Sequence, residues 1–355
     1  IQNALSSSGR SVSIDGFRGA LSSEAAFARL TIADDAGVWL TLQNVVLDWN
    51  RSALLRGRLE VTSLTAQRLD LPRLPLPQED ALPDAEATPF SLPDLPVSIL
   101  LQQFAVNQIN LGAPLVGEPV QLSVQASARF DDEVADLDLT AERTDGQNGS
   151  FAVKGNFERS DSMLDLLLRL SEGNEGIAAR LMQLPGLPSV EMTIEGSGPV
   201  DDFTTDIQVL TDGAPRIAGQ VSLGTQAGGP ETAGEDRRVR ADIQGDITAL
   251  LAPRFREFFG EDLRLTADAL IQGNGAIDVS VFSLNAQAVQ LEGEVALNTD
   301  KWPTLIDING VIGNPDGTSI LLPVGGEGTQ VEEMRLRVDY DAEDSDAIEA
   351  RFEIG

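Results

Sequence analysis

Apolar and polar residues alternate with a period of two along most of this chain. The stretches 120–130 and 289–297 show the pattern clearly, with an apolar side chain or a glycine at every second position. Successive side chains of a β-strand point to opposite faces of its sheet, so each stretch predicts a strand with one apolar and one polar face. Repeated along the chain, such strands predict a large sheet with a continuous apolar face.

The pattern divides the chain into three segments. Residues 1–71 are predicted to form an N-terminal β segment, and residues 97–355 a longer series of strands. Between them, residues 72–96 contain seven of the 18 prolines and five acidic residues. Proline fixes φ and lacks a backbone donor, so we expect 72–96 to form an extended linker or a crossing loop. A proline-rich peptide ligand is the less favoured alternative, because the segment is acidic.

Two helical segments interrupt the strands, and their spacing indicates an internal repeat. Apolar residues with a period near 3.6 predict short amphipathic helices near 175–184 and 246–259. Glycine-bearing strands at 217–221 and 291–295 follow these helices, and 153–157 is an earlier relative. We therefore expect a repeat of roughly 70 to 77 residues, with strand glycines marking bends or bulges of a curved sheet.

Composition narrows the choice of chemistry and partner. Hydrophobic residues make up 42% of the chain and aromatic residues only 5%, so the apolar face is mostly aliphatic. The formal net charge of −31, from 25 basic and 56 acidic residues, repels phosphate backbones and argues against a nucleic-acid partner. Trp39, Trp49 and Trp302 are expected to pack inside the protein rather than to stack on a ligand.

No catalytic site is predicted. The chain has neither His nor Cys, which excludes imidazole and thiol groups as nucleophiles, bases or zinc ligands. The acidic clusters at 131–133, 201–202 and 341–346 could bind Ca²⁺, but none has the spacing of a known calcium loop, and solvated turns are favoured. We expect a protein that is not an enzyme and that uses no metal or cofactor.

No stretch is apolar over the roughly 18 residues that a membrane helix needs, and no signal peptide is recognised. The chain begins at Ile1 without an initiator Met, from which we expect a mature or trimmed fragment.

Two folds fit the strand pattern. Sandwiches or barrels would close the apolar face on itself. Evenly spaced strands, few large aromatics and one helix per repeat instead favour an open array. We predict an all-β, elongated, strongly curved, repeat-built sheet that forms a long U-shaped groove with an apolar interior, plus the two short helices.

The N-terminal segment also carries a family likeness. The stretches SVSIDGFRGALSS at 11–23, LTIAD at 30–34, GVWLTL at 37–42 and VLDWNRSALLRGRL at 46–59 resemble the N-terminal region of the TamB family in its alphaproteobacterial form. These translocation and assembly module subunits belong with the AsmA-like proteins of the bacterial envelope. The likeness is specific over 11–71, and beyond that it rests on strand periodicity and glycine-bearing strands alone.

The resemblance implies a periplasmic protein that is anchored to the inner membrane in its full-length form. It implies phospholipid passage between the inner and outer membranes and a link to assembly of outer-membrane proteins. The family's membrane anchor and the C-terminal domain that meets its outer-membrane barrel partner are absent from these residues. We therefore expect an N-proximal section of such a protein.

The leading functional prediction is a non-enzymatic conduit whose apolar groove carries phospholipid acyl chains. A scaffold that pairs its sheet edges with client strands during assembly of outer-membrane β-barrel proteins and autotransporters is the alternative. An acidic, Ca²⁺-stabilised adhesive repeat is a third hypothesis. The predicted groove lining consists of aliphatic and aromatic residues from the alternating strands: Leu122, Val124, Val153, Phe157, Leu166, Leu168, Met192, Ile194, Ile207, Val209, Ile217, Val221, Leu265, Ile271, Leu291, Val295, Ile306, Ile308, Leu336 and Val338.

Overall fold

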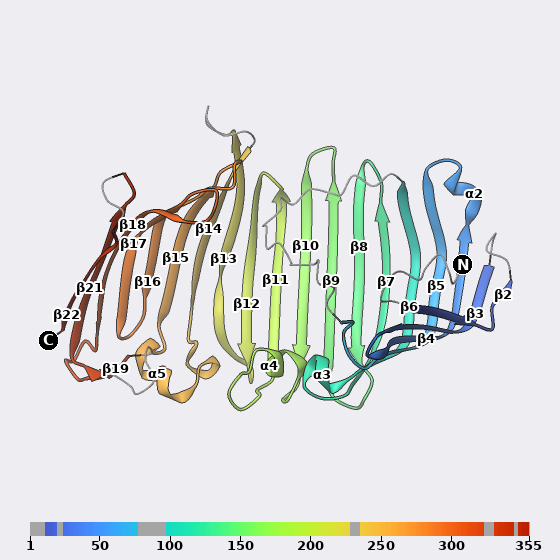
Figure 1. The fold of residues 1–355 in the computed structure, drawn as a ribbon, viewed down its shortest axis with the longest axis horizontal. Helices are drawn as coiled ribbons and strands as arrows, with labels where there is room; N and C mark the ends of the chain where they lie inside the picture. The colour runs from blue at the N-terminus through green and yellow to red at the C-terminus, as the bar shows by residue number, and fades with distance from the viewer. Residues whose placement is uncertain are drawn as a thin grey trace. The chain divides into compact units, whose positions relative to one another are not determined.

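The computed structural model describes residues 11–19, 24–76, 97–227, 235–322, 330–343 and 347–354. Hydrogen-bond ladders join 20 strands into one long mixed sheet, and β19 and β20 form a separate two-stranded hairpin. Short helices lie in some of the connections (Figure 1). The predicted all-β fold, built on an open sheet with short helices, is confirmed.

The chain forms two compact units, and each is described by itself. Unit 1 comprises residues 1–161 and 166–181, and unit 2 comprises residues 162–165 and 182–355. Strand β10 (Met163–Glu172) is divided between them. The boundary predicted at residues 72–96 falls inside unit 1.

Unit 1 is a sheet in which β1 and β2 both pair with β3, and β3 to β9 follow in chain order. All of these pairs are antiparallel except β5 and β6, which run parallel. Its elements are β1 (Ser11–Asp15), β2 (Arg18–Gly19), β3 (Glu24–Asp34), β4 (Gly37–Asn50), α2 (Arg51–Leu54), β5 (Arg58–Leu71), β6 (Ser98–Leu111), α3 (Ala113–Val116), β7 (Val120–Phe130), β8 (Val134–Arg143), β9 (Gly149–Glu158) and α4 (Ile177–Leu181).

The parallel pairing of β5 with β6 explains the proline-rich segment. Parallel neighbours cannot be joined by a hairpin and need a crossover connection, which the residues between Leu71 and Ser98 must provide. Residues 77–96 of the predicted linker lie outside the described residues.

The described start of the crossover is bound to unit 1 by an ion pair. The guanidinium of Arg73 donates to both carboxylate oxygens of Asp34, at 2.9 and 2.5 Å, and the N–H groups of Ala36 and Leu76 donate to the same carboxylate. The hydrogen bond from Arg73 lowers the pKa of Asp34 far below its usual range, outweighing desolvation. Residues 72–76 are thus held against the β3–β4 turn.

Unit 2 is an antiparallel meander. Strands β11 to β18 pair in chain order, and β21 and β22 extend the sheet beyond β18. Its elements are β11 (Val190–Pro199), β12 (Asp202–Thr211), β13 (Ala214–Ala227), β14 (Glu235–Gly245), the 3₁₀ helix η1 (Thr248–Leu250), α5 (Pro253–Phe259), β15 (Leu263–Ile271), β16 (Ile277–Asn285), β17 (Val289–Leu297), β18 (Pro303–Gly313), β19 (Ile320–Leu321), β20 (Gln330–Val331), β21 (Glu333–Asp341) and β22 (Glu349–Ile354).

The helices are shorter than predicted. The segment near 175–184 is α-helical only at α4, and 246–259 is interrupted between η1 and α5. The interruption covers Leu251, whose backbone is extended, and Ala252, whose ψ of 143° is not helical. Pro253 disfavours the helical conformation of Ala252, the residue before it. No helix among the described residues is long and apolar enough to cross a membrane.

Glycine at 219 permits close approach of two strands rather than a bulge. The β12–β13 and β13–β14 ladders pass through Gly219 without a register shift. A Cβ at this position would collide with the backbone carbonyl oxygen of Asp242 and lie 2.7 Å from the Cα of Ile243. By contrast, a Cβ at Gly155, the matching glycine of the predicted repeat, would meet open space.

Replacing these two glycines by alanine should therefore give opposite results. In Gly219→Ala, backbone atoms of β14 must move, and we expect a loss of about 1–3 kcal/mol in the free energy of unfolding. Gly155→Ala should be neutral or slightly stabilising, because alanine restricts the unfolded chain more than glycine does. Urea unfolding of both variants measures the difference. Equal effects would contradict the close approach at Gly219.

Candidate functional site

The strand registers of unit 2 gather its apolar side chains on one side of the sheet. Residues directly opposite each other in neighbouring strands share a face. Ile194 lies opposite Ile207, Val295 opposite Ile306, and Ile308 opposite Val338. Through every pair from β11 to β22, the residues that alternate with these positions lie on the same side of the sheet. We refer to this choice of alternate positions along a strand as its parity. We call this side the apolar face of unit 2.

The predicted lining residues fall on consistent faces. Fourteen lie on the apolar face of unit 2: Met192, Ile194, Ile207, Val209, Ile217, Val221, Leu265, Ile271, Leu291, Val295, Ile306, Ile308, Leu336 and Val338. In unit 1, Leu122, Val124, Val153 and Phe157 share one face of β7 to β9. Leu166 and Leu168 share a face of β10 because they are two residues apart.

All twenty of these side chains are half-buried. Side chains in the middle of a sandwich core would be fully buried, since two sheets interdigitate across it. The described residues form one large sheet and one two-stranded hairpin, so they hold no second sheet of matching size. The apolar face of unit 2 is therefore partly accessible along its length.

The opposite face of unit 2 is polar and internally paired. Arg238 donates to both oxygens of Asp268 at 2.7 and 2.6 Å, and Arg264 donates to Asp242 at 2.8 Å. The hydrogen bond from Arg238 lowers the pKa of Asp268, so this carboxylate stays charged at neutral pH. This face is accordingly suited to water.

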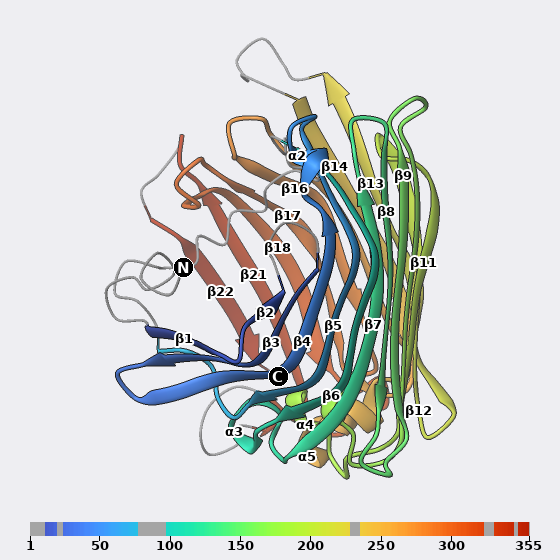
Figure 2. The ribbon, with the colours of Figure 1, turned by 90° about the vertical axis from the view of Figure 1, so that its right-hand side faces the viewer.

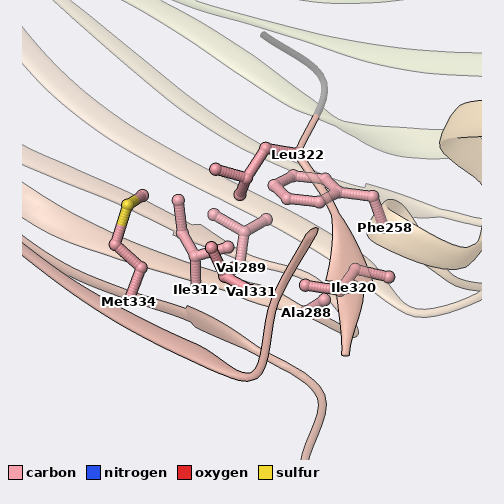
Figure 3. Close-up of a cluster of buried hydrophobic side chains, with 8 residues drawn as sticks. All are labelled: Phe258, Ala288, Val289, Ile312, Ile320, Leu322, Val331 and Met334. Atoms are coloured by element: carbon pink, nitrogen blue, oxygen red, sulfur yellow. The ribbon is translucent and has the colours of Figure 1, made fainter. Parts of the chain in front are cut away.

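One rim of the apolar face is sealed by a small core. Phe258 of α5 and Ile320, Leu322 and Val331 of the β19–β20 hairpin pack on the strand ends, as Figure 3 shows. The N–H of Ala288 donates to the carbonyl of Phe258 at 3.1 Å and fastens α5 to the β16–β17 turn. The buried cluster is Phe258, Ala288, Val289, Ile312, Ile320, Leu322, Val331 and Met334.

We call this edge the helical rim. Figures 1 and 2 both place α5 at the ends of the strands opposite to the end at which β13 finishes and β14 begins.

The other rim of unit 2 carries no such core in the described residues. It consists of the turns at 200–201, 272–276 and 298–302, the strand ends at Ala227 and Glu235, and residues 342–343 and 347–348 between β21 and β22. Its apolar-face residues range from Phe203 of β12, which is buried, through the half-buried Leu297 to the exposed Leu223 of β13. Trp302, predicted to pack inside the protein, is 72% exposed here, so that prediction is wrong. We call this edge the open rim.

The apolar side of unit 1 is more completely covered. Val45, Ala66 and Val106 are buried on β4, β5 and β6, and Phe27 and Phe104 are among the half-buried residues packed against them. This cluster was not part of the predicted lining, because the pairing of β5 with β6 could not be read from the sequence.

Unit 1 also holds a buried ion network that the sequence did not indicate. Arg143 lies opposite Leu122 on the apolar side, yet its side chain is only 4% exposed. Its guanidinium is 2.8 Å from Asp145 and 3.5 Å from Glu118, and Glu118 also pairs with Arg180 of α4 at 3.1 Å. Burial raises the pKa of Asp145, but hydrogen bonds from Arg143 and from backbone N–H groups outweigh it, so the pKa is lowered. The network ties α4 to the end of β8.

The acidic clusters form turns. One oxygen of Asp131 accepts the N–H groups of Glu133 and Val134, and Asp341 accepts the N–H of Glu343. Within the described ranges, no three acidic side chains are placed to hold a metal ion. Residues 344–346 of the third cluster lie outside the described residues.

A cavity of about 450 Å³ lies on the polar face of unit 2 and includes Arg335, Arg337 and Arg351 in its lining. Each of these arginines pairs with an acidic residue two positions away on its own strand. Its charged side chains have the opposite strand parity to the apolar face, and Leu291 and Leu336 of that face also contribute to its lining.

Comparison with models of protein families, with curated proteins and with solved structures found no match. The likeness of residues 11–71 to the TamB family stays a prediction from the sequence.

The sealed rim and the open part of the apolar face should respond differently to truncation. Ile320→Ala removes a side chain that is 2% exposed and leaves a cavity, so we expect a loss of about 2–5 kcal/mol in the free energy of unfolding. Ile306→Ala removes a half-buried side chain without leaving an enclosed cavity and should cost about 1–2 kcal/mol. Urea unfolding measures both. A large loss for Ile306→Ala would mean that this part of the face is covered.

Proposed function

We propose that this protein carries the acyl chains of lipids along its apolar sheet face, without catalysis. The observation that carries the proposal is the continuous, half-buried aliphatic face of unit 2. From the resemblance of residues 11–71, we further propose that the carried lipids are phospholipids moving between the two membranes of a bacterial envelope.

The energetics favour an occupant of this face. Large contiguous apolar patches are uncommon on soluble monomers and mark interaction sites. Each methylene buried against the face contributes about 0.8 kcal/mol. Aliphatic contact is non-directional, so an acyl chain could move along the face without meeting a specific binding station.

The dimensions suit an acyl chain. From Leu291 to Leu297, β17 spans six residue steps, which is about 20 Å of strand. The tails of one bilayer leaflet occupy about 15 Å, half of a ~30 Å hydrocarbon core. A tail can therefore lie along the strands between the helical rim and the open rim.

A charge placed on the apolar face should abolish lipid binding without unfolding the protein. Ile308→Asp puts a carboxylate in the middle of the face, and we expect binding of tail-labelled phosphatidylcholine to fall at least tenfold. Val311→Asp is the matched control, because Val311 lies on the same strand, has the opposite parity and is 41% exposed. Transfer of the fluorescent lipid from vesicles to the purified protein, with circular dichroism of both variants, makes the measurement.

Equal binding by the wild type and Ile308→Asp would contradict the proposal, as would a wild type that takes up no lipid. Unfolding of Ile308→Asp alone would indicate a closed core, and Ile308→Ser then provides a milder polar replacement with the same expected direction.

A second candidate function rests on β22. This strand pairs with β21 on one side, and all six of its residues are exposed, including Phe352 at 58% and Ile354 at 66%. An edge strand of this kind can accept another strand through backbone hydrogen bonds. We propose as the alternative a scaffold that pairs client strands with this edge.

Photo-crosslinking separates the two functions. A crosslinker at Arg351, whose side chain lies on the polar face of β22, should capture unfolded outer-membrane polypeptides if the scaffold function is right. Capture with no lipid bound to the same protein would favour the scaffold over the conduit. No capture under conditions that load lipid would remove the scaffold.

A further inference from the structure

The two rims of the apolar face of unit 2 differ, and the difference determines how an amphiphile can lie on it. At the helical rim, Val289, Ile312 and Met334 are already covered by α5 and the β19–β20 hairpin. At the open rim, the ends of the same strands lead into polar turns. An amphiphile has one end that needs apolar cover and one that needs water, and only one orientation provides both.

The turns of the open rim are hydrophilic. Asn274 accepts the N–H of Ala276, and Asn298 accepts the N–H groups of Asp300 and Trp302. The ammonium of Lys301 donates to the carbonyl of Gly275 at 2.5 Å and so is directed into the neighbouring turn. A lipid headgroup would lie beside these groups and beside the exposed Trp302.

The charge at the open rim is strongly one-sided. We consider the described turn residues and the two strand residues that flank each turn. Their one basic residue is Lys301. Arg237 and Arg238 follow within two steps into β14, where Arg238 pairs with Asp268, and Arg351 follows one step into β22, where it pairs with Glu349. Their carboxylates are Asp201, Asp202, Glu235, Asp236, Asp278, Asp300, Asp341, Glu343 and Glu349.

We propose that unit 2 selects amphiphiles with an ammonium-bearing, zwitterionic headgroup, held at the open rim with the tails directed toward α5. This inference rests on the proposed lipid-carrying function and adds to it the class and orientation of the lipid. The carboxylates of the rim attract the ammonium group, whereas a headgroup that carries only a phosphate is repelled by them. The attraction is screened at distances beyond about 10 Å in 0.1 M salt, so it acts mainly on headgroups at the rim itself.

Two tail-labelled phospholipids with identical acyl chains test the selection, one with an ethanolamine and one with a glycerol headgroup. We expect the full chain to take up the ethanolamine lipid about five- to tenfold better at low salt. The preference should nearly vanish at about 1 M salt, where the screening length falls to about 3 Å.

Paired charge-neutralising variants locate the selection. One variant removes three exposed carboxylates of open-rim turns through Asp201→Asn, Asp300→Asn and Glu343→Gln. In this variant, the ratio of ethanolamine-lipid uptake to glycerol-lipid uptake should fall toward one. The control removes three exposed carboxylates beside α5 through Glu257→Gln, Glu261→Gln and Asp262→Asn, and it should keep the preference. Equal losses in both variants would assign the effect to net charge and overturn the role of the open rim.

Tryptophan quenching tests the orientation. Phosphatidylcholine with a spin label near the headgroup, at chain position 5, should quench Trp302 more than the same lipid labelled at position 16. The signal of Trp302 is the part of the emission lost in Trp302→Phe. Equal quenching, or stronger quenching from position 16, would overturn the proposed orientation.

The two proposals fail in different ways. A wild type that binds neither phospholipid overturns the lipid-carrying function and this inference together. A wild type that binds both equally, or prefers the glycerol lipid, overturns only the headgroup selection and leaves the carrying function in place.

Discussion

The register between neighbouring strands is the constraint on which the rest of this structure depends. Because side chains alternate with a period of two, a slip of one residue in any ladder would move a strand's aliphatic side chains to the water side. The ladders of unit 2 keep one parity from β11 to β22. Across the shift between Val279 and Phe282, Val279 and Leu284 stay on the apolar face, whereas Val281 lies opposite Asp268 on the polar side. A continuous apolar face exists only because every pair agrees.

A face of this kind conflicts with solubility, and the two units handle the conflict differently. In unit 1, aromatic side chains cover Val45, Ala66 and Val106, and ion pairs satisfy the buried Arg143. In unit 2, cover is concentrated at the helical rim, and the middle of the face stays half-buried. Unit 2 is therefore where an occupant would add most to stability. The acidic open rim borders this face with polar groups on one side.

Much of this architecture could be predicted from local pattern. The alternation in 120–130 and 289–297 appears as β7 and β17 with the expected bounds. The helix near 246–259 was predicted from its apolar spacing. Its interruption before Pro253 was not predicted, because it depends on the non-helical backbone of Ala252. Strand β4 continues through Asn44 although this residue has a positive φ of 50°, because the ladder with β3 resumes on the far side of it.

The sequence by itself determined that this protein is a many-stranded sheet with one aliphatic and one acidic, water-suited face, since both properties follow from residue alternation along single strands. Tertiary structure alone decided which strands are neighbours, including the parallel pair of β5 and β6. It also decided that Phe258 and Ile320 seal one rim while Trp302 stands exposed at the other. These features depend on contacts between residues far apart in the chain, and no local periodicity encodes such contacts.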